Sequence, residues 1–467
     1  MKILQISASD IAGGAERVAF NLCKEYQVGG HESLLAVGHK YSSDNSVVEI
    51  QNDAHRSAWA RFCKKAGGRV WGLPFSSAAK KKLEKAFEHI GEPDRFNRIE
   101  KGYEDFNYPG IWHLLEEIKM KPDIIHCHNL HGGYFDLNAL SVLSKQVPLL
   151  ITMHDAWLLS GHCAHSFDCE RWKTGCGSCP DLTIYPSVEK DNTHANWEKK
   201  KAIFKNGRVY ISAPCNWLID KAGRSVFNEY FAGKRTVNNG IDTTRFNDKD
   251  KAVAKKNLGI GDDTFVMLFA GNLLKNNIWK DYNTLFKTLG ILAQKAERRK
   301  LLFIALGTDN KGGDIFPGEL EGIEKLFVPR IDDVSKVAEY YKASDVYMHP
   351  AFVDTFPNVV LEAMACGTPV VATGICGIPE QVKSLECSAK ASNMKGWRKE
   401  EATGILVPPK SPEAMSEAIL TLMKDSALRT LMGSNAAKHT AANFDLKQQA
   451  GNYLRWYKEI IEAEKAR

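Results

Sequence analysis

The sequence predicts an α/β protein made of two halves, each built on a doubly wound parallel sheet. Apolar runs of strand length alternate with helical patterns in both halves, as parallel strands covered by helices on both faces require. The 467 residues exceed the length of one ordinary hydrophobic core. The apolar runs stay far below the roughly 18 residues that a membrane-spanning helix needs. A folded chain of two domains is therefore expected.

The strands and helices can be placed in order along the chain. Expected strands cover 2–7, 33–38, 123–128 and 148–154 in the first half, and 264–271, 300–307, 325–330, 345–350 and 368–374 in the second. Expected helices of the second half cover 281–295, 334–343, 358–366 and 412–423. Because such sheets bind ligands at the carboxyl ends of their strands, the expected site is a cleft between the two domains.

A turn-rich segment at 238–251 marks the predicted domain boundary. We therefore expect an N-terminal domain over 1–237 and a C-terminal domain over 238–445. The last segment, 446–467, has a helical pattern and is expected to pack back across the N-terminal domain.

The overall composition is that of a folded cytoplasmic protein. Apolar residues make up 44% and charged residues 25%, and the formal net charge is +6. No nucleic-acid-reading motif accompanies this mild charge, so no nucleic-acid partner is expected. The first ten residues lack the long apolar region of a signal peptide, and many of the 11 cysteines stand alone in apolar segments, as reduced buried thiols do.

A basic insertion over 56–110 interrupts the α/β pattern of the N-terminal domain. Its first part, 56–85, carries the single acid Glu84, with Trp59, Phe62, Trp71 and Phe75 interleaved. The basic residues of this part are Arg56, Arg61, Lys64, Lys65, Arg69, Lys80, Lys81, Lys82 and Lys85. This mixture suits an anionic membrane surface. The alternative is a solvated helical insertion whose aromatic side chains pack on the domain.

Two segments place backbone N–H groups where a phosphate or a sugar can bind. Gly13 and Gly14 follow the first strand and precede a helical pattern, which allows a close approach to a ligand; a simple turn is the alternative. In the second half, Pro357 suits the first turn of a helix and leaves the N–H groups of Asn358 and Val359 available to a diphosphate. Glu362 lies one turn later among apolar residues, where an ionised carboxylate needs a partner such as a pair of sugar hydroxyls.

Several of these motifs together resemble a known family. They are GGAE near the start, SAPCNWL (212–218), NNGID (238–242), and the D-x7-E spacing followed by AMACGTPVVAT and GIPE. The combination resembles the retaining, nucleotide-sugar-dependent glycosyltransferases of family 4, which have the two-domain GT-B fold. The resemblance spans nearly the whole chain, and 349–380 is its most specific part.

The resemblance implies roles for particular residues in the donor site. Glu362 would hold the nucleotide ribose, and Asp354, which stands where the family more often has Glu, would face the donor sugar. Lys280 would bind the diphosphate. Asn272 occupies the position of a second, arginine contact of the family, and Lys275 is a candidate to replace that charge.

The resemblance also implies a histidine near the donor sugar, and His154 follows a first-domain strand as that role requires. A structural histidine is the alternative. Asp155 is a candidate for contacting the acceptor or for orienting His154, and His128 is a further acceptor-side candidate. The implied mechanism is front-face substitution without a catalytic divalent metal, with a saccharide or lipid-linked saccharide as acceptor. A nucleotide-sugar 2-epimerase of similar fold and a non-catalytic sugar-nucleotide-binding protein are the alternative functions.

Four cysteines are clustered in the loop 161–182. They follow the spacing C-x5-C-x6-C-x2-C, and their C-x2-C half is typical of zinc knuckles. They are Cys163, Cys169, Cys176 and Cys179. A structural zinc ion with four protein ligands has no open position for chemistry, so it would order the loop. Two disulfides or four free thiols are the alternatives, and His162 and His165 are alternative ligands.

Overall fold

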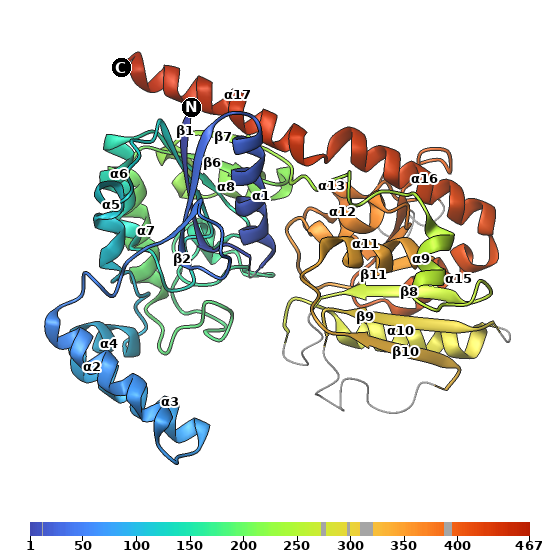
Figure 1. Cartoon of the computed structure of the whole chain (residues 1–467), viewed down its shortest axis with the longest axis horizontal. Coiled ribbons are helices and arrows are strands. Elements are labelled where there is room, and N and C mark those ends of the chain that lie inside the picture. Colours follow the sequence, from blue (N-terminus) through green and yellow to red (C-terminus); the bar gives the residue numbers. More distant parts are fainter. Residues whose placement is uncertain (12, 272–276, 297–298, 309–320, 387–394) are drawn as a thin grey trace. The chain divides into compact units, whose positions relative to one another are not determined.

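The computed structural model describes residues 1–11, 13–271, 277–296, 299–308, 321–386 and 395–467. The chain forms two compact units (Figure 1). Unit 1 contains Met1–Pro214, Leu218–Val237 and Asn452–Arg467. Unit 2 contains Cys215–Trp217 and Asn238–Gly451.

Unit 1 is built on a seven-stranded sheet in which every neighbouring pair is parallel. The strand order is β3-β2-β1-β4-β5-β6-β7. The strands are β1 (Lys2–Ser9), β2 (Glu32–His39), β3 (Val47–Glu49), β4 (Ile124–His128), β5 (Leu149–Thr152), β6 (Val209–Ala213) and β7 (Phe231–Thr236). The order reverses between β1 and β4. Such a switch point is where doubly wound sheets bind ligands, outside the carboxyl ends of the strands.

Unit 2 repeats this arrangement with six parallel strands among its described residues, in the order β10-β9-β8-β11-β12-β13. They are β8 (Phe265–Ala270), β9 (Leu301–Leu306), β10 (Ile323–Val328), β11 (Val346–His349), β12 (Val370–Thr373) and β13 (Gly404–Val407). Its switch point lies between β8 and β11. The two doubly wound parallel sheets confirm the predicted fold class.

The helices connect successive strands and supply the apolar layers that pack on the sheets. In unit 1 they are α1 (Gly14–Val28), α2 (Ala58–Arg69), α3 (Ser77–Gly91), α4 (Pro93–Glu100), α5 (Leu114–Glu117), α6 (Leu140–Gln146) and α7 (Thr193–Asn206), with α8 (Asn216–Gly223) at the unit boundary. In unit 2 they are α9 (Lys251–Asn257), α10 (Tyr282–Lys295), α11 (Val334–Ala343), α12 (Asn358–Ala365), α13 (Ile378–Gln381), α15 (Pro412–Lys424) and α16 (Ser426–Asn443). Short 3-10 turns are η1 (Val70–Gly72), η2 (Pro109–Trp112), η3 (Leu137–Ala139), η4 (Trp157–Leu159), η5 (Arg171–Lys173) and η6 (Val226–Tyr230).

The last helix, α17 (Leu446–Lys465), belongs to unit 2 up to Gly451 and to unit 1 from Asn452. Its unit 1 part is held by buried tyrosine hydroxyls. Tyr453 lies 2.9 Å from the Thr152 hydroxyl of β5, and Tyr457 lies 2.6 Å from Nδ1 of His126 on β4. These hydrogen bonds tie the end of the chain to the central strands of the unit 1 sheet.

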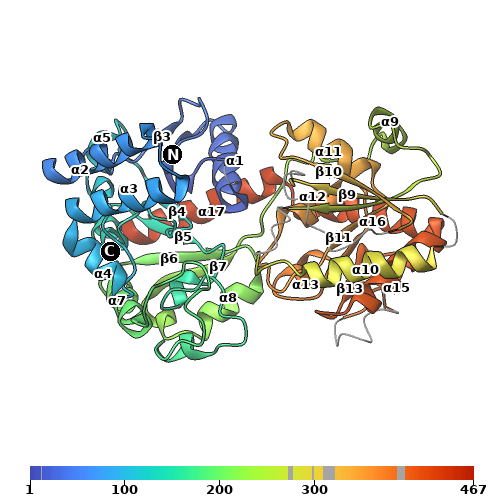
Figure 2. The same ribbon diagram turned by 90° about the horizontal axis from the view of Figure 1, so that it is seen from below.

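The basic insertion forms three helices, α2 to α4. Gly91 at the end of α3 faces Ala60 and Cys63 near the start of α2, while Gly67 faces Phe87, so α2 and α3 pack antiparallel. Figure 1 shows the pair extending from the body of unit 1, and Figure 2 shows the two helices from below, in front of the rest of that unit. A side chain on Gly67 or Gly91 would come within 3.1 Å of the opposite helix, so these glycines permit the close packing. Across the residues that the structure describes, no helix is both long and apolar enough to span a bilayer.

Candidate functional site

The switch point of unit 2 holds a cluster of three polar side chains. The backbone brings them together: Lys280 pairs with Ala351 in an antiparallel bridge, and the Phe352 N–H donates to the Trp279 carbonyl at 2.9 Å. Lys280 Nζ donates to Asp354 Oδ2 at 2.7 Å and lies 3.2 Å from His349 Nε2. His349 is the last residue of β11 and is fully buried. The sequence predicted Lys280 and Asp354, and the structure adds His349 as their common neighbour.

The electrostatics of this cluster leave one cation paired with one anion. Burial opposes the charged form of Asp354, but Lys280 overrides that effect and holds the pKa of Asp354 well below its usual value. Burial, reinforced by Lys280, lowers the pKa of His349 to about 4. His349 is thus neutral at pH 7; its Nε2 lies 3.2 Å from both Lys280 Nζ and Asp354 Oδ2, and its Nδ1 lies 3.2 Å from the Tyr347 hydroxyl. We call Lys280, Asp354 and His349 the lysine triad.

Glu362 lies on α12 and is fixed from a neighbouring helix. The hydroxyl of Tyr341 on α11 donates to Glu362 Oε2 at 2.8 Å, and Tyr341 is fully buried. Burial raises the pKa of Tyr341 well above its usual value, so the phenol remains a hydrogen-bond donor at any ordinary pH. A buried donor on one carboxylate oxygen holds the side chain in a single orientation. Sequence analysis did not find this partner, because Tyr341 and Glu362 meet only through helix packing.

The start of α12 differs in detail from the prediction. Pro357 is the N-cap, with φ −66° and ψ 122°, and the helix begins at Asn358 rather than at the proline. Asn358 Oδ1 accepts from the side-chain amide of Asn239 at 3.1 Å. Lys280 likewise lies just before the N-cap of α10, Asp281, rather than within that helix. Asn272 and Lys275, the two candidates for a second diphosphate contact, lie outside the described residues.

In unit 1, the glycine pair follows β1 at the switch point. Gly13 is the N-cap of α1, and a Cβ there would lie 2.3 Å from Glu16 Oε2, so a side chain at this position would displace the Glu16 carboxylate. A Cβ at Gly14 would meet no atom within 4 Å, which leaves open space beside the helix start. Burial raises the pKa of Glu16.

His128 and His154 form a hydrogen-bonded pair beside the same switch point. Gln5 donates its amide to the Ala19 carbonyl, so its Oε1 accepts from His128 Nε2 at 3.1 Å. Burial lowers the pKa of His128 well below normal and that of His154 to about 4, so both rings are neutral. His128 Nδ1 therefore accepts from His154 Nε2 at 3.1 Å. This order of donors leaves Nδ1 of His154 as an acceptor, suited to a sugar hydroxyl.

Asp155 orients a different histidine from the one expected. His131 Nε2 donates to Asp155 Oδ2 at 2.7 Å, so Asp155 supports His131 and not His154. Burial disfavours the charged forms of both side chains, but the effect of the charged partner is larger in each case. Asp155 raises the pKa of His131, and His131 lowers the pKa of Asp155 to about 2. Each of the two side chains thus favours the charged form of the other. In the turn after β5, the side chains of the consecutive residues His154 and Asp155 reach different partners. Sequence periodicity does not encode such a turn.

The four clustered cysteines line one small pocket of about 20 Å³ in the loop after β5. All four are free thiols, which excludes the disulfide alternative in this structure. The Gly161 N–H donates to Cys176 Sγ at 3.2 Å, and His162 Nε2 lies 3.4 Å from Cys179 Sγ. Burial raises the pKa of Cys163 to about 11 and of Cys176 to about 12. Within the described ranges, no three or more His, Cys, Asp or Glu side chains already stand together as metal ligands.

Comparison with solved structures places this fold in a class. Sucrose-phosphate synthase from Thermosynechococcus elongatus matches with a TM-score of 0.63 and 18% identity, covering 99% of this chain and 100% of that one. HepE of Anabaena, solved with UDP-glucose, matches with a TM-score of 0.56 and 17% identity, covering 97% and 99%. At such identities the likeness concerns the fold, and that fold is the GT-B architecture of two doubly wound units.

Sequence comparison then supplies the family. The model described as "Glycosyltransferase Family 4" matches 12–187, and the model described as "Glycosyl transferases group 1" matches 250–439. The chain belongs to glycosyltransferase family 4, as the motifs indicated.

Curated relatives match over part of their length. The D-inositol 3-phosphate glycosyltransferase of Kineococcus radiotolerans is 30% identical over 235 residues, which cover 48% of this chain and 51% of that protein. The putative colanic acid biosynthesis glycosyl transferase WcaC of Escherichia coli is 28% identical over 268 residues, covering 54% and 60%. The matched region therefore spans about half the length of these relatives.

Proposed function

We propose that this protein is a retaining glycosyltransferase that moves a sugar from a nucleotide diphosphate sugar to a hydroxyl of a saccharide or lipid-linked saccharide. The observation that carries the proposal is the lysine triad at the switch point of unit 2, near the Tyr341-anchored Glu362. A cation beside a helix start suits a diphosphate, and a fixed carboxylate suits the two hydroxyls of a ribose. The UDP-glucose complex of the structurally similar HepE supports a nucleotide-sugar donor.

The proposed reaction is a front-face substitution. The bond between C1 of the sugar and the diphosphate oxygen breaks while C1 bonds the acceptor oxygen from the same face. The acceptor proton passes to the departing diphosphate oxygen. Lys280 and the Asn358 and Val359 N–H groups stabilise the developing negative charge, and Asp354 holds a hydroxyl of the transferred sugar. This scheme needs no catalytic divalent metal.

The test of this function is a screen followed by a stereochemical assay. A ligand that binds only the folded state raises the melting temperature, so nucleotides and nucleotide sugars are screened by thermal shift. The stabilising donor is then incubated with simple glycoside acceptors, and NMR determines the anomeric configuration of the product. A product with the configuration of the donor supports the proposal. An inverted product contradicts the retaining mechanism.

A nucleotide-sugar 2-epimerase remains the alternative enzyme, because it shares the two-unit architecture. The D-x7-E spacing of Asp354 and Glu362 favours the transferase. Appearance of the 2-epimer of the nucleotide sugar without any acceptor would reverse this choice. A non-catalytic sugar-nucleotide-binding protein would bind the donor without cleaving it.

We also propose that the α2–α3 pair binds an anionic membrane surface and so brings the enzyme to a lipid-linked acceptor. Trp59, Phe62 and Phe75 are 55%, 63% and 50% exposed, so these rings do not pack on the domain. Most of the basic residues of 56–85 accompany them. Arg56 is the exception, because its side chain is only 7% exposed and binds Glu92. Exposed aromatic rings among lysines and arginines match the chemistry of an anionic lipid interface.

We further propose that the four clustered cysteines hold a structural zinc ion. Their side chains line one pocket, and the buried Lys200, which is paired with Glu104 at 2.8 Å, lies near Cys163 and Cys176. Zinc–sulfur bonds of about 2.3 Å require the thiols to draw in around the metal. Zinc binding therefore orders the loop that follows His154.

A further inference from the structure

Unit 1 contains a pocket of about 370 Å³ that lies outside the candidate functional site described above. Its floor is the carboxyl end of β2, at Gly38 and His39, together with Gly133 and Tyr134 of the loop after β4. Helices α2 and α4 of the basic insertion form its walls. This volume lies within the range of small-molecule binding pockets.

The pocket belongs to the same sheet edge as the His128–His154 pair. Tyr134, which lines the pocket, donates its hydroxyl to the carbonyls of Asn129 at 3.0 Å and His128 at 3.3 Å. The side chain of Asn52 crosses the floor, donating to the Tyr134 carbonyl and accepting from the Gly110 N–H, both at 2.9 Å. These hydrogen bonds thus connect the floor of the pocket to the switch point of the unit 1 sheet.

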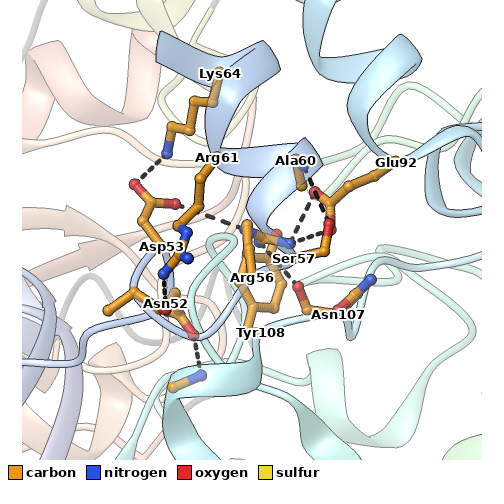
Figure 3. A network of polar contacts seen from close by, with 12 residues as sticks. Asn52, Asp53, Arg56, Ser57, Ala60, Arg61, Lys64, Glu92, Asn107 and Tyr108 are labelled. Carbon is orange, nitrogen blue, oxygen red and sulfur yellow. Dashed lines mark hydrogen bonds and ion pairs between the residues drawn. The ribbon is translucent and has the colours of Figure 1, made fainter.

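The walls are held by a chain of ion pairs. Figure 3 shows the Arg56 guanidinium reaching both oxygens of Glu92, at 2.6 and 2.8 Å, and Lys64 reaching Asp53. Beyond the residues labelled there, Arg95 joins Glu92 at 2.7 Å to Asp105 at 3.0 Å. Tyr108 donates to Asp105 at 2.8 Å. Helices α2 and α4 and the following loop are therefore locked together, and the wall presents fixed donors and acceptors.

The charges of the lining select the class of ligand. Five carboxylates, of Glu49, Asp53, Glu88, Glu92 and Asp105, face three permanent cations, of Arg56, Lys64 and Arg95. This excess of negative charge disfavours a phosphate or another anion. Paired carboxylates and guanidinium groups accept from and donate to hydroxyls, and the Tyr108 and Tyr134 rings offer apolar faces. The combination fits a ligand rich in hydroxyls.

We propose that this pocket binds a neutral saccharide unit of the acceptor. The inference rests on the proposed transferase function and adds the place and the chemical class of the acceptor. The insertion then has a definite role in unit 1: it closes a sugar-binding pocket over the edge of the sheet that carries His128 and His154.

The test uses saturation-transfer NMR on the full chain. The probes are the methyl glycosides of glucose, galactose, mannose and N-acetylglucosamine, with methyl glucuronide as the charged comparison. Gln51 lies exposed at the pocket rim, so Gln51→Trp fills the pocket without disturbing the core. Gln146→Trp, at an exposed position on α6 away from the pocket, is the matched control. Glu49→Gln, a second rim variant, removes one negative charge and keeps the shape.

The expected result is saturation transfer to at least one neutral glycoside, reduced at least fivefold by Gln51→Trp, weakened by Glu49→Gln and unchanged by Gln146→Trp. Absence of transfer to all four neutral glycosides overturns the proposal, as does transfer that survives Gln51→Trp. Stronger saturation transfer to methyl glucuronide than to the neutral glycosides overturns the proposal that the ligand is a neutral saccharide. Cleavage of the donor is measured in parallel. Donor cleavage without glycoside binding defeats only this inference, whereas glycoside binding without donor binding or cleavage defeats the proposed function.

Discussion

Lys280 Nζ lies 2.7 Å from Asp354 Oδ2, and both groups reach Nε2 of the buried His349 at 3.2 Å. The lysine is thus paired with a carboxylate, and a diphosphate that enters the site adds a second anion to the same cation. The carboxylate keeps the lysine oriented, and the neutral histidine contacts both groups without adding positive charge. This arrangement predicts that the three side chains act as a unit.

Lys280→Ala is expected to lower kcat/KM roughly 100- to 1000-fold, because it removes a cation from the developing charge of the leaving group. It also leaves Asp354 without its main partner, which costs about 1–3 kcal/mol of the free energy of unfolding. Since Lys280 helps to depress the pKa of His349, NMR titration of this ring in the variant should give a pKa above about 4.

Lys295→Ala is the matched control, because it breaks an exposed pair with Glu417 in the same unit. Its effect on stability should stay below about 1 kcal/mol, with activity unchanged. Equal losses of activity in the two variants would refute the assignment of Lys280.

The free energy of unfolding should decrease as the pH falls, at pH values above those at which the carboxylates protonate. His154 and His349 have pKa values of about 4 in the folded protein against about 6.5 when unfolded. Because the unfolded chain binds more protons between these values, stability is complete above pH 6.5 and declines as the pH falls toward 4. Each histidine contributes a slope of up to about 1.4 kcal/mol per pH unit.

Urea unfolding at pH 7.5, 6.0 and 5.0 measures this decline. The double variant His154→Asn, His349→Asn should reduce the slope between pH 6.0 and 5.0. An unchanged slope would show that these rings are not held neutral by the fold.

Much of the fold and part of the site follow from sequence. Apolar runs predicted nine of the 13 described strands, because period is a local property, and missed β3, β6, β7 and β13. The sequence motifs also singled out Lys280 and Asp354, which the structure brings together. The partners Tyr341 and His349 were missed, although His349 begins the motif, since each meets its partner through packing or strand order. Of the two roles expected for Asp155, the orienting one goes to His131 rather than to His154, because the turn after β5 decides which ring the carboxylate reaches, and the acceptor-side role stays a prediction.

The zinc proposal predicts one zinc ion per chain in protein purified without chelator. Cys176→Ser and Cys179→Ser should each lose the metal and lower the melting temperature, because the metal ties the loop together. Cys376→Ser, a partly exposed cysteine outside the loop, should keep both metal and stability. Metal analysis that finds no zinc, together with four titratable loop thiols in the native protein, would exclude the site.

The membrane proposal predicts binding to vesicles of phosphatidylcholine with 30% phosphatidylglycerol and weak binding to pure phosphatidylcholine. Replacing Lys80, Lys81 and Lys82 by Gln should weaken binding by about 1 kcal/mol for each charge. The double variant Trp59→Ser, Phe62→Ser should weaken binding further by removing the exposed rings.

Val142→Ser, which changes an exposed apolar residue on α6, is the control and should bind as the parent does. Flotation with vesicles measures all of these variants. Equal binding to both kinds of vesicle would contradict the electrostatic part of the proposal.

Release of nucleotide diphosphate from the preferred donor, compared between the parent, Glu362→Ala and Tyr341→Phe, tests the central claim most directly. If Glu362 anchors the ribose and Tyr341 orients it, Glu362→Ala should lower kcat/KM for the donor at least 100-fold. Tyr341→Phe, which removes one hydrogen bond to a charged group, should raise the donor KM about 10-fold. Tyr26→Phe, which loses a buried hydroxyl contact to Tyr457 in unit 1, should leave the donor KM unchanged. Undiminished release by Glu362→Ala would contradict the account.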